Sequence, residues 1–323
     1  MAASRNSRPS DLPARVGAFL ATRSAPSDRL SVGLSGGCDS VVLLHALVAC
    51  GLKERLQAIH VHHGLSPNAD AWADFCTDYC RRLDVPLVVR RVVVDANAGC
   101  GLEAAAREAR YAVFAEEAGD ILLLAHHRGD QAETVLFNLL RGCGVTGAAG
   151  MPTERRLGHR RLLRPLLGVA RSEIEVYARA ADLAWIEDES NDDTALTRNY
   201  LRHEALVSLS QRFPAAESAL AQAATNFAEA GELLDDLGIL DWQVVGEGEV
   251  ALLGELRKLS LPRLKNLLRH RLRVLGWQVP VASRLDEFSR QLLLAAPDRH
   301  PELQLPDGTM RVAQRRLHWL AGK

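Results

Sequence analysis

The first two hundred residues alternate short aliphatic runs with stretches of helical pattern, and this alternation restricts the fold more than any other feature. The aliphatic runs predict strands at Leu30–Leu34, Leu56–His62, Leu87–Val94 and Ile121–Ala125. Helical patterns lie between them, at residues 41–50, 69–83 and 102–118. Strands that are rich in Val, Leu and Ile along their whole length are typical of a parallel sheet covered on both faces. We therefore expect an α/β domain with helices on both faces of the sheet and a ligand site beyond the carboxyl ends of its strands.

The texture of the chain changes after about Pro214, where Ala/Leu/Glu-rich and then Leu/Arg-rich helical patterns follow. A chain of 323 residues is long enough for two domains. We expect a catalytic domain over residues 1–214 and a smaller, mainly helical domain over residues 215–323. Asp307-Gly308 predicts the turn of a closing hairpin.

Composition excludes several classes of protein. Apolar residues make up 47% and charged residues 24%, which is ordinary for a globular protein with a core. No unbroken aliphatic run is longer than the five residues of Ile121–Ala125, far short of the roughly 20 residues that span a bilayer. Six cysteines occur without a CxxC pair, which argues against a zinc ribbon or a thioredoxin-type centre. We expect reduced thiols, a cytoplasmic protein and no membrane partner.

Charge is unevenly distributed although the net charge is only −1. Residues 215–255 hold nine acidic residues and no basic one, whereas residues 256–323 hold fourteen basic and five acidic ones, a balance of +9. Such a block is typical either of a polyanion-binding surface or of a solvated helical face. A second basic segment predicts a loop that contacts phosphate; it contains Arg155, Arg156, Arg160, Arg161 and Arg164.

A glycine-rich loop follows the first predicted strand, and its sequence is Ser35-Gly36-Gly37-Cys38-Asp39-Ser40. Consecutive glycines let the backbone approach a ligand and turn N–H groups inward. The serine hydroxyls add donors, and the amino end of the following helix favours phosphate oxygens. The loop lacks the Gly-Lys-Ser/Thr of a Walker A motif.

A second constellation follows the strand at 121–125. His126, Asp130 and Glu133 are spaced i, i+4, i+7, which predicts one helical face with an imidazole and two carboxylates. Such a face can bind a cation, orient an amine or accept a proton. Arg198 and Arg202 are four residues apart on another predicted helix and can clamp a phosphate.

Read in order, the segments SGGCDS, HVHHGLS, EAAAREARY, AHHRGDQAET, RGCGVTGAAGM, RPLL, WIEDESN and TRNYLRHE resemble the successive motifs of tRNA(Ile)-lysidine synthetases. These enzymes belong to the PP-loop ATP pyrophosphatase (N-type) superfamily, and the resemblance covers roughly residues 30–205. It implies a Rossmann-like PP-loop fold. It also implies a ligase that adenylylates the C2 carbonyl oxygen of the wobble cytidine in the CAU-anticodon tRNA(Ile), after which free L-lysine displaces AMP from C2 to give lysidine.

The resemblance implies roles for individual residues. Ser35, Gly36, Gly37, Cys38, Asp39 and Ser40 would bind ATP, with Asp39 also placing Mg²⁺. Asp130 and Glu133 would bind lysine. Catalytic roles are expected for Asp39, Arg107, His126 and Asp130, with His126 or Asp130 taking the proton of the lysine ammonium. Arg198, Asn199 and Arg202 are expected to contact tRNA or phosphate.

Alternative functions remain open at this point. A PP-loop tRNA thiolase usually needs paired cysteines, and here Cys76 and Cys80 are four residues apart on a predicted helix. A catalytically inactive tRNA-binding protein would retain the fold, although an intact SGGCDS and DQAET argue against decay. A PP-loop amide synthetase acting on a small molecule fits the basic C-terminal block less well. The assembly is undetermined, with a homodimer among the options.

Overall fold

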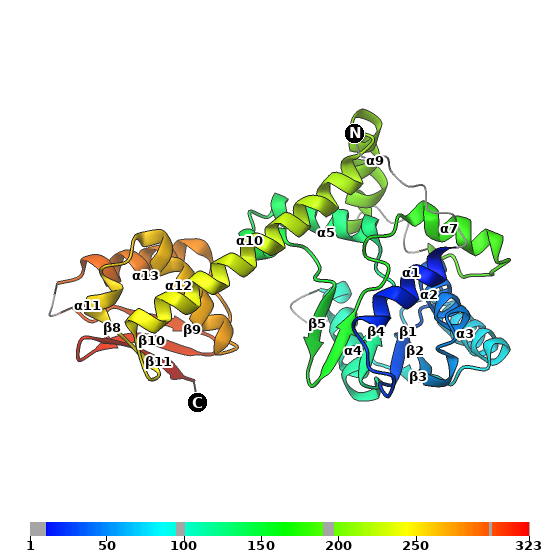
Figure 1. The fold of residues 1–323 in the computed structure, drawn as a ribbon, viewed down its shortest axis with the longest axis horizontal. Coiled ribbons are helices and arrows are strands. Elements are labelled where there is room, and N and C mark those ends of the chain that lie inside the picture. Colours follow the sequence, from blue (N-terminus) through cyan, green and yellow to red (C-terminus); the bar gives the residue numbers. More distant parts are fainter. Residues whose placement is uncertain (1–10, 95–100, 190–196, 297–298, 323) are drawn as a thin grey trace. The chain divides into compact units, whose positions relative to one another are not determined.

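A computed structural model describes residues 11–94, 101–189, 197–296 and 299–322, with only the backbone of Glu103. The chain divides into two compact units, Met1–Asn226 and Phe227–Lys323 (Figure 1). Within the described residues, no helix is both long and apolar enough to cross a membrane.

The first unit is built on a six-stranded sheet in the order β3-β2-β1-β4-β6-β5. The strands are β1 (Leu30–Gly33), β2 (Leu56–His62), β3 (Leu87–Arg91), β4 (Ile121–Leu123), β5 (Glu154–Leu157) and β6 (Arg160–Leu163). All neighbours are parallel except the edge pair β5–β6. The four predicted strands and the expected parallel α/β fold are therefore confirmed.

Two hydrophobic cores lie on opposite faces of this sheet, because successive side chains of a strand point to opposite faces. Ile121 and Leu123 belong to one core, and Leu122 and Leu124 belong to the other. The first core is covered by α1 (Leu12–Ala21), α2 (Cys38–Ala49), α3 (Ala69–Leu83) and α7 (Arg171–Ala180). The second is covered by α4 (Leu102–Glu117). Burial on both faces explains why the strands are apolar without interruption.

The basic segment at 155–164 was predicted as a loop, and this was wrong: it forms most of the β5–β6 hairpin. Gly158, at φ +60°, makes the turn. Arg161 is bound to Glu154 at 2.7 Å, and Arg160 donates to the carbonyl oxygens of Glu116 and Gly119. Because each of the two strands contains a pair of adjacent arginines, the segment has too few aliphatic residues to stand out as a strand.

The first unit has further helical elements besides those that cover the two cores. They are η2 (Lys53–Arg55), α5 (Arg128–Leu140), α6 (Val145–Ala148), α8 (Thr197–Tyr200), the π-helix η4 (Leu201–Ala205), α9 (Leu206–Arg212) and the first part of α10 (Ala216–Val245). The division between the units falls inside α10, later than the boundary expected at residue 214. The amino-acid composition changes where α10 begins. The residues of α10 begin to pack with the second unit only farther along the helix, so the boundary lies later than composition suggests.

The second unit packs the rest of α10, α11 (Leu253–Leu256), α12 (Leu261–Val274) and α13 (Ala282–Leu294) against an antiparallel sheet. The sheet has the order β7-β8-β11-β10-β9, with β7 (Gly246–Glu247), β8 (Val250–Leu252), β9 (Glu302–Leu305), β10 (Gly308–Ala313) and β11 (Arg316–Ala321). The hairpin predicted at Asp307-Gly308 is confirmed as the β9–β10 connection. The unit is mainly helical, as expected, but its strands form a full sheet.

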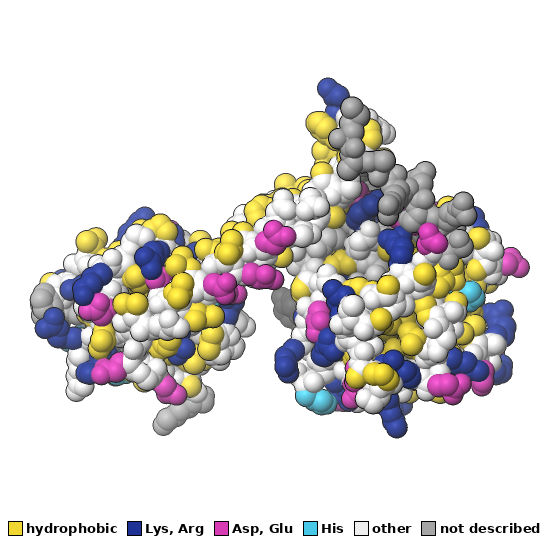
Figure 2. All heavy atoms as spheres, in the orientation of Figure 1, with side chains coloured by type: hydrophobic (Ala, Val, Ile, Leu, Met, Phe, Trp, Pro, Cys, Tyr) yellow, Lys and Arg dark blue, Asp and Glu magenta, His cyan; other side chains and the backbone are white. Residues whose placement is uncertain are grey.

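Several acidic residues of α10 and β7 pair with basic residues that follow them in the chain. Asp235 binds Arg273, Asp241 binds Arg263 and Glu247 binds Arg316. On the visible face, blue and magenta side chains are interspersed (Figure 2). The acidic block that precedes residues 256–323 therefore offsets their +9 balance locally. A count along the sequence treats the two blocks separately and does not show this.

Candidate active site

The glycine-rich loop lies between the carboxyl end of β1 and the amino end of α2, as predicted. Its two serines close it: the Ser35 N–H donates to the Ser40 hydroxyl at 3.2 Å, and that hydroxyl donates to the Gly37 carbonyl at 3.0 Å. The Ser35 side chain is exposed and the Ser40 side chain is buried. The loop is thus an ordered backbone cradle at the positive end of a twelve-residue helix, which suits phosphate oxygens.

Gly36 is the position where this loop requires glycine. Its φ is +91°, in the region that L side chains rarely adopt. A Cβ there would collide with Cδ1 of Ile186, whose N–H donates to the Gly36 carbonyl at 2.9 Å. The loop is therefore fastened to the segment that contains Ile186.

Cys38 contributes to the cradle only through its backbone. Its side chain is 2% exposed and packs in the core beneath α2. Burial raises the pKa of this thiol to about 11, although Arg171 acts in the opposite direction. The thiol is therefore neutral and unsuited to nucleophilic chemistry.

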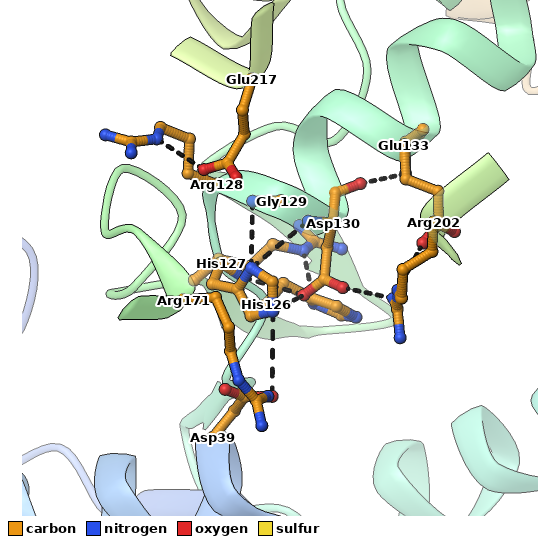
Figure 3. Close-up of polar contacts among 12 residues, drawn as sticks. Asp39, His126, His127, Arg128, Gly129, Asp130, Glu133, Arg171, Arg202 and Glu217 are labelled. Atoms are coloured by element: carbon orange, nitrogen blue, oxygen red, sulfur yellow. Dashed lines mark hydrogen bonds and ion pairs between the residues drawn. The ribbon is translucent and has the colours of Figure 1, made fainter. Parts of the chain in front are cut away.

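His127 fixes the amino end of α5 by a capping box. Its Nδ1 accepts from the Gly129 N–H at 3.0 Å and the Asp130 N–H at 3.4 Å, while Oδ2 of Asp130 accepts from the His127 N–H at 2.9 Å. Because Nδ1 is an acceptor, the neutral ring carries its hydrogen on Nε2. That atom lies 3.6 Å from Asp130 Oδ2 and 3.9 Å from Asp39 Oδ2 (Figure 3). His127 therefore connects the glycine-rich loop to α5.

His126 was predicted on the same helical face as Asp130 and Glu133, and this was wrong. The helix begins at Arg128, so His126 precedes it. Its Nδ1 accepts from Arg164 Nε at 3.1 Å. Burial lowers the pKa of His126 to about 3, and Arg164 and Arg107 contribute in the same direction against Asp130. A neutral imidazole with this pKa is a poor proton acceptor near neutrality.

Asp39 is the first-turn acid of α2. Its Oδ2 forms an ion pair with Nη1 of Arg171, the first residue of α7. Burial raises the pKa of Asp39, although His127 and Arg171 lower it. Its Oδ1 is buried and has no hydrogen-bond partner among the described residues.

This orphaned oxygen allows a test of whether the site fits Mg²⁺. In nucleotide sites Mg²⁺ commonly takes one or two carboxylates together with phosphate oxygens and water. In the described part of the chain, no group of three or more His, Cys, Asp or Glu side chains could hold a metal alone. The residues present therefore fit a magnesium ion that binds together with a triphosphate.

Asp130 and Glu133 both project from α5 toward one guanidinium. Arg202 Nη2 lies 2.8 Å from Asp130 Oδ1 and 2.8 Å from Glu133 Oε2 (Figure 3). Arg198 Nη1 lies 3.7 Å from Glu133 Oε1. Glu133 is only 3% exposed, and burial raises its pKa although both arginines lower it. The predicted carboxylate pair is thus confirmed as a pair, but arginines predicted to bind phosphate neutralise it.

Arg202 lies in the π-helix η4, and π-helical turns are frequent at functional sites. Asn199 lies in α8, between Arg198 and Arg202 in the chain. Arg107, on α4, stands near His126 and donates to the phenol oxygen of Tyr111 at 3.5 Å. Contacts of these residues with ATP or RNA remain predictions.

Sequence reasoning missed His127 and Arg171 as parts of this site. The signal for His127 was available, because a polar residue three positions before Asp130 fits the spacing of a capping box. For Arg171 no local signal exists, because its contact with Asp39 joins residues that are 132 positions apart.

Two family models match the chain. One, described as a PP-loop domain, covers residues 10–209, which include the glycine-rich loop and both carboxylates. The other, described as the TilS substrate binding domain, covers residues 253–318. A tRNA(Ile)-lysidine synthase from Aromatoleum aromaticum is 48% identical over 295 residues, which are 90% of this chain and 68% of that protein. This chain belongs to the tRNA(Ile)-lysidine synthase family.

Another member of the tRNA(Ile)-lysidine synthase family, from Pseudomonas syringae pv. tomato, is 43% identical and covers 96% of this chain and 72% of its own length. The chain thus spans about two thirds to three quarters of these relatives. Among solved structures, a U34-tRNA thiolase from Methanococcus maripaludis has a TM-score of 0.55 at 16% identity, covering 68% of this chain and 79% of its own. That likeness concerns the fold alone.

Proposed function

We propose that this protein is a tRNA(Ile)-lysidine synthase. It uses ATP to join free L-lysine to C2 of the wobble cytidine of the CAU-anticodon tRNA(Ile), and the products are lysidine, AMP and pyrophosphate. The observation that carries the proposal is the carboxylate pair Asp130–Glu133 beside an ordered PP-loop, within a chain of this family. We place the reaction in the cytoplasm, where ATP, lysine and tRNA meet, and a homodimer stays a prediction.

In the first step the C2 carbonyl oxygen attacks the α-phosphorus of ATP. A carbonyl oxygen is a weak nucleophile, so the step depends on positioning and on neutralising phosphate charge. The loop N–H groups of residues 35–40 and the amino end of α2 would hold the leaving pyrophosphate. Asp39 would hold Mg²⁺ through its orphaned Oδ1, and the ion would neutralise charge on the phosphates.

In the second step the ε-amine of lysine attacks C2 and AMP leaves. Lysine arrives as an ammonium ion and must lose a proton before it attacks. Asp130 and Glu133 would attract that cation by exchanging it for the guanidinium of Arg202. Burial raises the pKa of Glu133, which favours it as the acceptor of that proton, whereas the pKa of His126, lowered by burial to about 3, is too low for this role.

The direct test is an incubation of purified protein with ATP, Mg²⁺, labelled lysine and unmodified CAU tRNA(Ile). The expected result is labelled tRNA together with AMP and pyrophosphate in equal amounts. Omitting ATP or using a tRNA with another anticodon should abolish the label. Sulfur transfer without lysine transfer would instead support a PP-loop thiolase, and tRNA binding without either reaction would support an inactive RNA-binding protein.

A further inference from the structure

A cluster of guanidinium groups surrounds Tyr111 of α4, apart from the glycine-rich loop. Cζ of Arg107 lies 5.0 Å from the centroid of the Tyr111 ring, and Cζ of Arg155 lies 4.8 Å from it. Arg155 belongs to β5 and shares a face of that strand with Leu157, which packs on the core beneath α4. Arg164, directly after β6, completes the cluster next to the phenol.

Arg164 is a buried charge that has no acidic partner among the described side chains. Its residue is 2% exposed, and it donates to His126 Nδ1 at 3.1 Å and to the Pro152 carbonyl at 2.6 Å. Among the described side chains, which do not include that of Glu103, Arg107, Arg155 and Arg164 form no ion pair with a carboxylate, and Nε of Arg155 is buried without a hydrogen-bond partner. Burying a cation is costly unless an anion compensates it. The arrangement therefore favours binding of an anion.

The pKa of the Tyr111 phenol also indicates that this cluster favours negative charge. Burial alone would raise its pKa, but Arg107, Arg155 and Arg164 together outweigh burial and lower it. Negative charge at the centre of the cluster is thus stabilised by three guanidinium groups. An incoming anionic oxygen would meet the same field.

The place of the cluster in the sheet separates it from the triphosphate site. The order β1-β4-β6-β5 puts the glycine-rich loop at β1, the α5 carboxylates after β4, and the arginines at β6 and β5. Adjacent strands are about 4.8 Å apart, so β6 and β5 lie roughly 10 and 14 Å from β1. A phosphate held by the loop therefore lies on the other side of the carboxylates. Three cations also exceed what the single carboxylate of an amino acid requires.

We propose that Arg107, Arg155 and Arg164, gathered around Tyr111, bind a backbone phosphate of the RNA next to the nucleotide that is modified. The proposal rests on the proposed function and specifies how the RNA is held beside the reacting base. Phosphate contacts of this kind fix the register of an RNA without reading its sequence. The site thereby presents the unstacked base between the glycine-rich loop and the α5 carboxylates.

The test is Arg155→Gln in the full-length chain, because Arg155 is only half-buried and its loss leaves no buried acid behind. Removing one charge-assisted contact should weaken binding of unmodified tRNA about tenfold. The slope of log affinity against log salt should become shallower by about one. KM values for ATP and for lysine should stay at their wild-type levels, and Arg155→Lys should restore part of the affinity.

Arg156→Gln is the matched control, because Arg156 is exposed on the opposite face of the same strand. Equal losses in both variants would indicate a general charge effect and overturn the site. A raised KM for lysine with unchanged tRNA binding would assign the cluster to the lysine carboxylate, and a raised KM for ATP would assign it to the triphosphate; either result overturns the proposal. If the wild type forms lysidine while Arg155→Gln binds tRNA normally, only this inference fails. A wild type without lysidine formation overturns the proposed function, while the binding data still test the phosphate site.

Discussion

Asp130 combines two tasks through its two oxygens. Oδ2 accepts from the His127 N–H and fixes the first turn of α5, and Oδ1 faces Arg202. The carboxylate that the mechanism uses is therefore oriented by the backbone of the helix that carries it. Glu133, one turn later, has no such cap and owes its position to burial and to two arginines.

These different surroundings lead to a prediction for Glu133. An ordinary glutamate has a pKa of about 4.3, and burial raises the pKa of Glu133 above that value. The carboxylate form of Glu133 therefore increases with pH in a window above about 4.3. If that carboxylate attracts the lysine ammonium, KM for lysine should fall as pH rises through this window. Glu133→Gln should raise KM for lysine about tenfold and remove the pH dependence, with KM for ATP much less affected. Steady-state kinetics from pH 5 to 8 would measure this.

Asp130→Asn is the companion variant, because its amide oxygen can still accept from the His127 N–H. It should raise KM for lysine while leaving the thermal unfolding temperature close to that of the wild type. Wild-type lysine kinetics in both variants would remove the pair from the lysine site.

At the scale of elements, the strands and most helices of the first unit could be predicted because their patterns are local. β2 and α3 have the predicted bounds, since the aliphatic run and the amphipathic stretch end at clear polar breaks. The β5–β6 hairpin could not be predicted, because two adjacent arginines in each short strand leave neither a continuous aliphatic run nor a regular alternation. His126 was misplaced because spacing alone does not show where a helix begins, and the capping by His127 decides that.

The glycine-rich loop yields a prediction that distinguishes its two glycines. Gly36→Ala places a Cβ in a left-handed conformation and against Ile186, so it should lower the melting temperature and abolish ATP binding. Gly37→Ala places its Cβ 3.5 Å from the Ser35 hydroxyl, at ordinary contact distance, and should keep the wild-type melting temperature. Differential scanning calorimetry with and without ATP would measure both. Equal melting temperatures for the two variants would contradict this account of the loop.

For the whole molecule, the charge distribution along the sequence gives an incomplete picture of the second unit. Asp241 is 1% exposed and binds Arg263, so this pair belongs to the packing of α10 against α12 rather than to an open surface. The long-range pairs in this unit arise only when the chain folds, which is why the +9 block overstates its attraction for a polyanion. Residues 253–318 match a family model described as a substrate binding domain, and we propose that this unit helps to hold the RNA.

If the first unit binds ATP and the second helps to hold RNA, the behaviour of a chain that ends at Asn226 can be predicted. It should retain ATP binding through the glycine-rich loop, while its affinity for tRNA should fall at least tenfold because one of the two parts proposed to contact RNA is gone. Filter binding of tRNA and calorimetric titration of ATP would measure this. Circular dichroism must first show the helical and strand content of the first unit, and undiminished tRNA affinity in such a folded fragment would place recognition there alone.

Arg202 is a resident cation between the two α5 carboxylates. An entering ammonium group therefore replaces a positive charge instead of adding one, and electrostatic attraction alone gains little from the exchange. Selectivity then depends on which group of the entering molecule can pair with the displaced guanidinium of Arg202. An amino acid brings its own carboxylate, whereas a diamine such as cadaverine brings none, so we expect the proposed lysine site to discriminate against decarboxylated lysine.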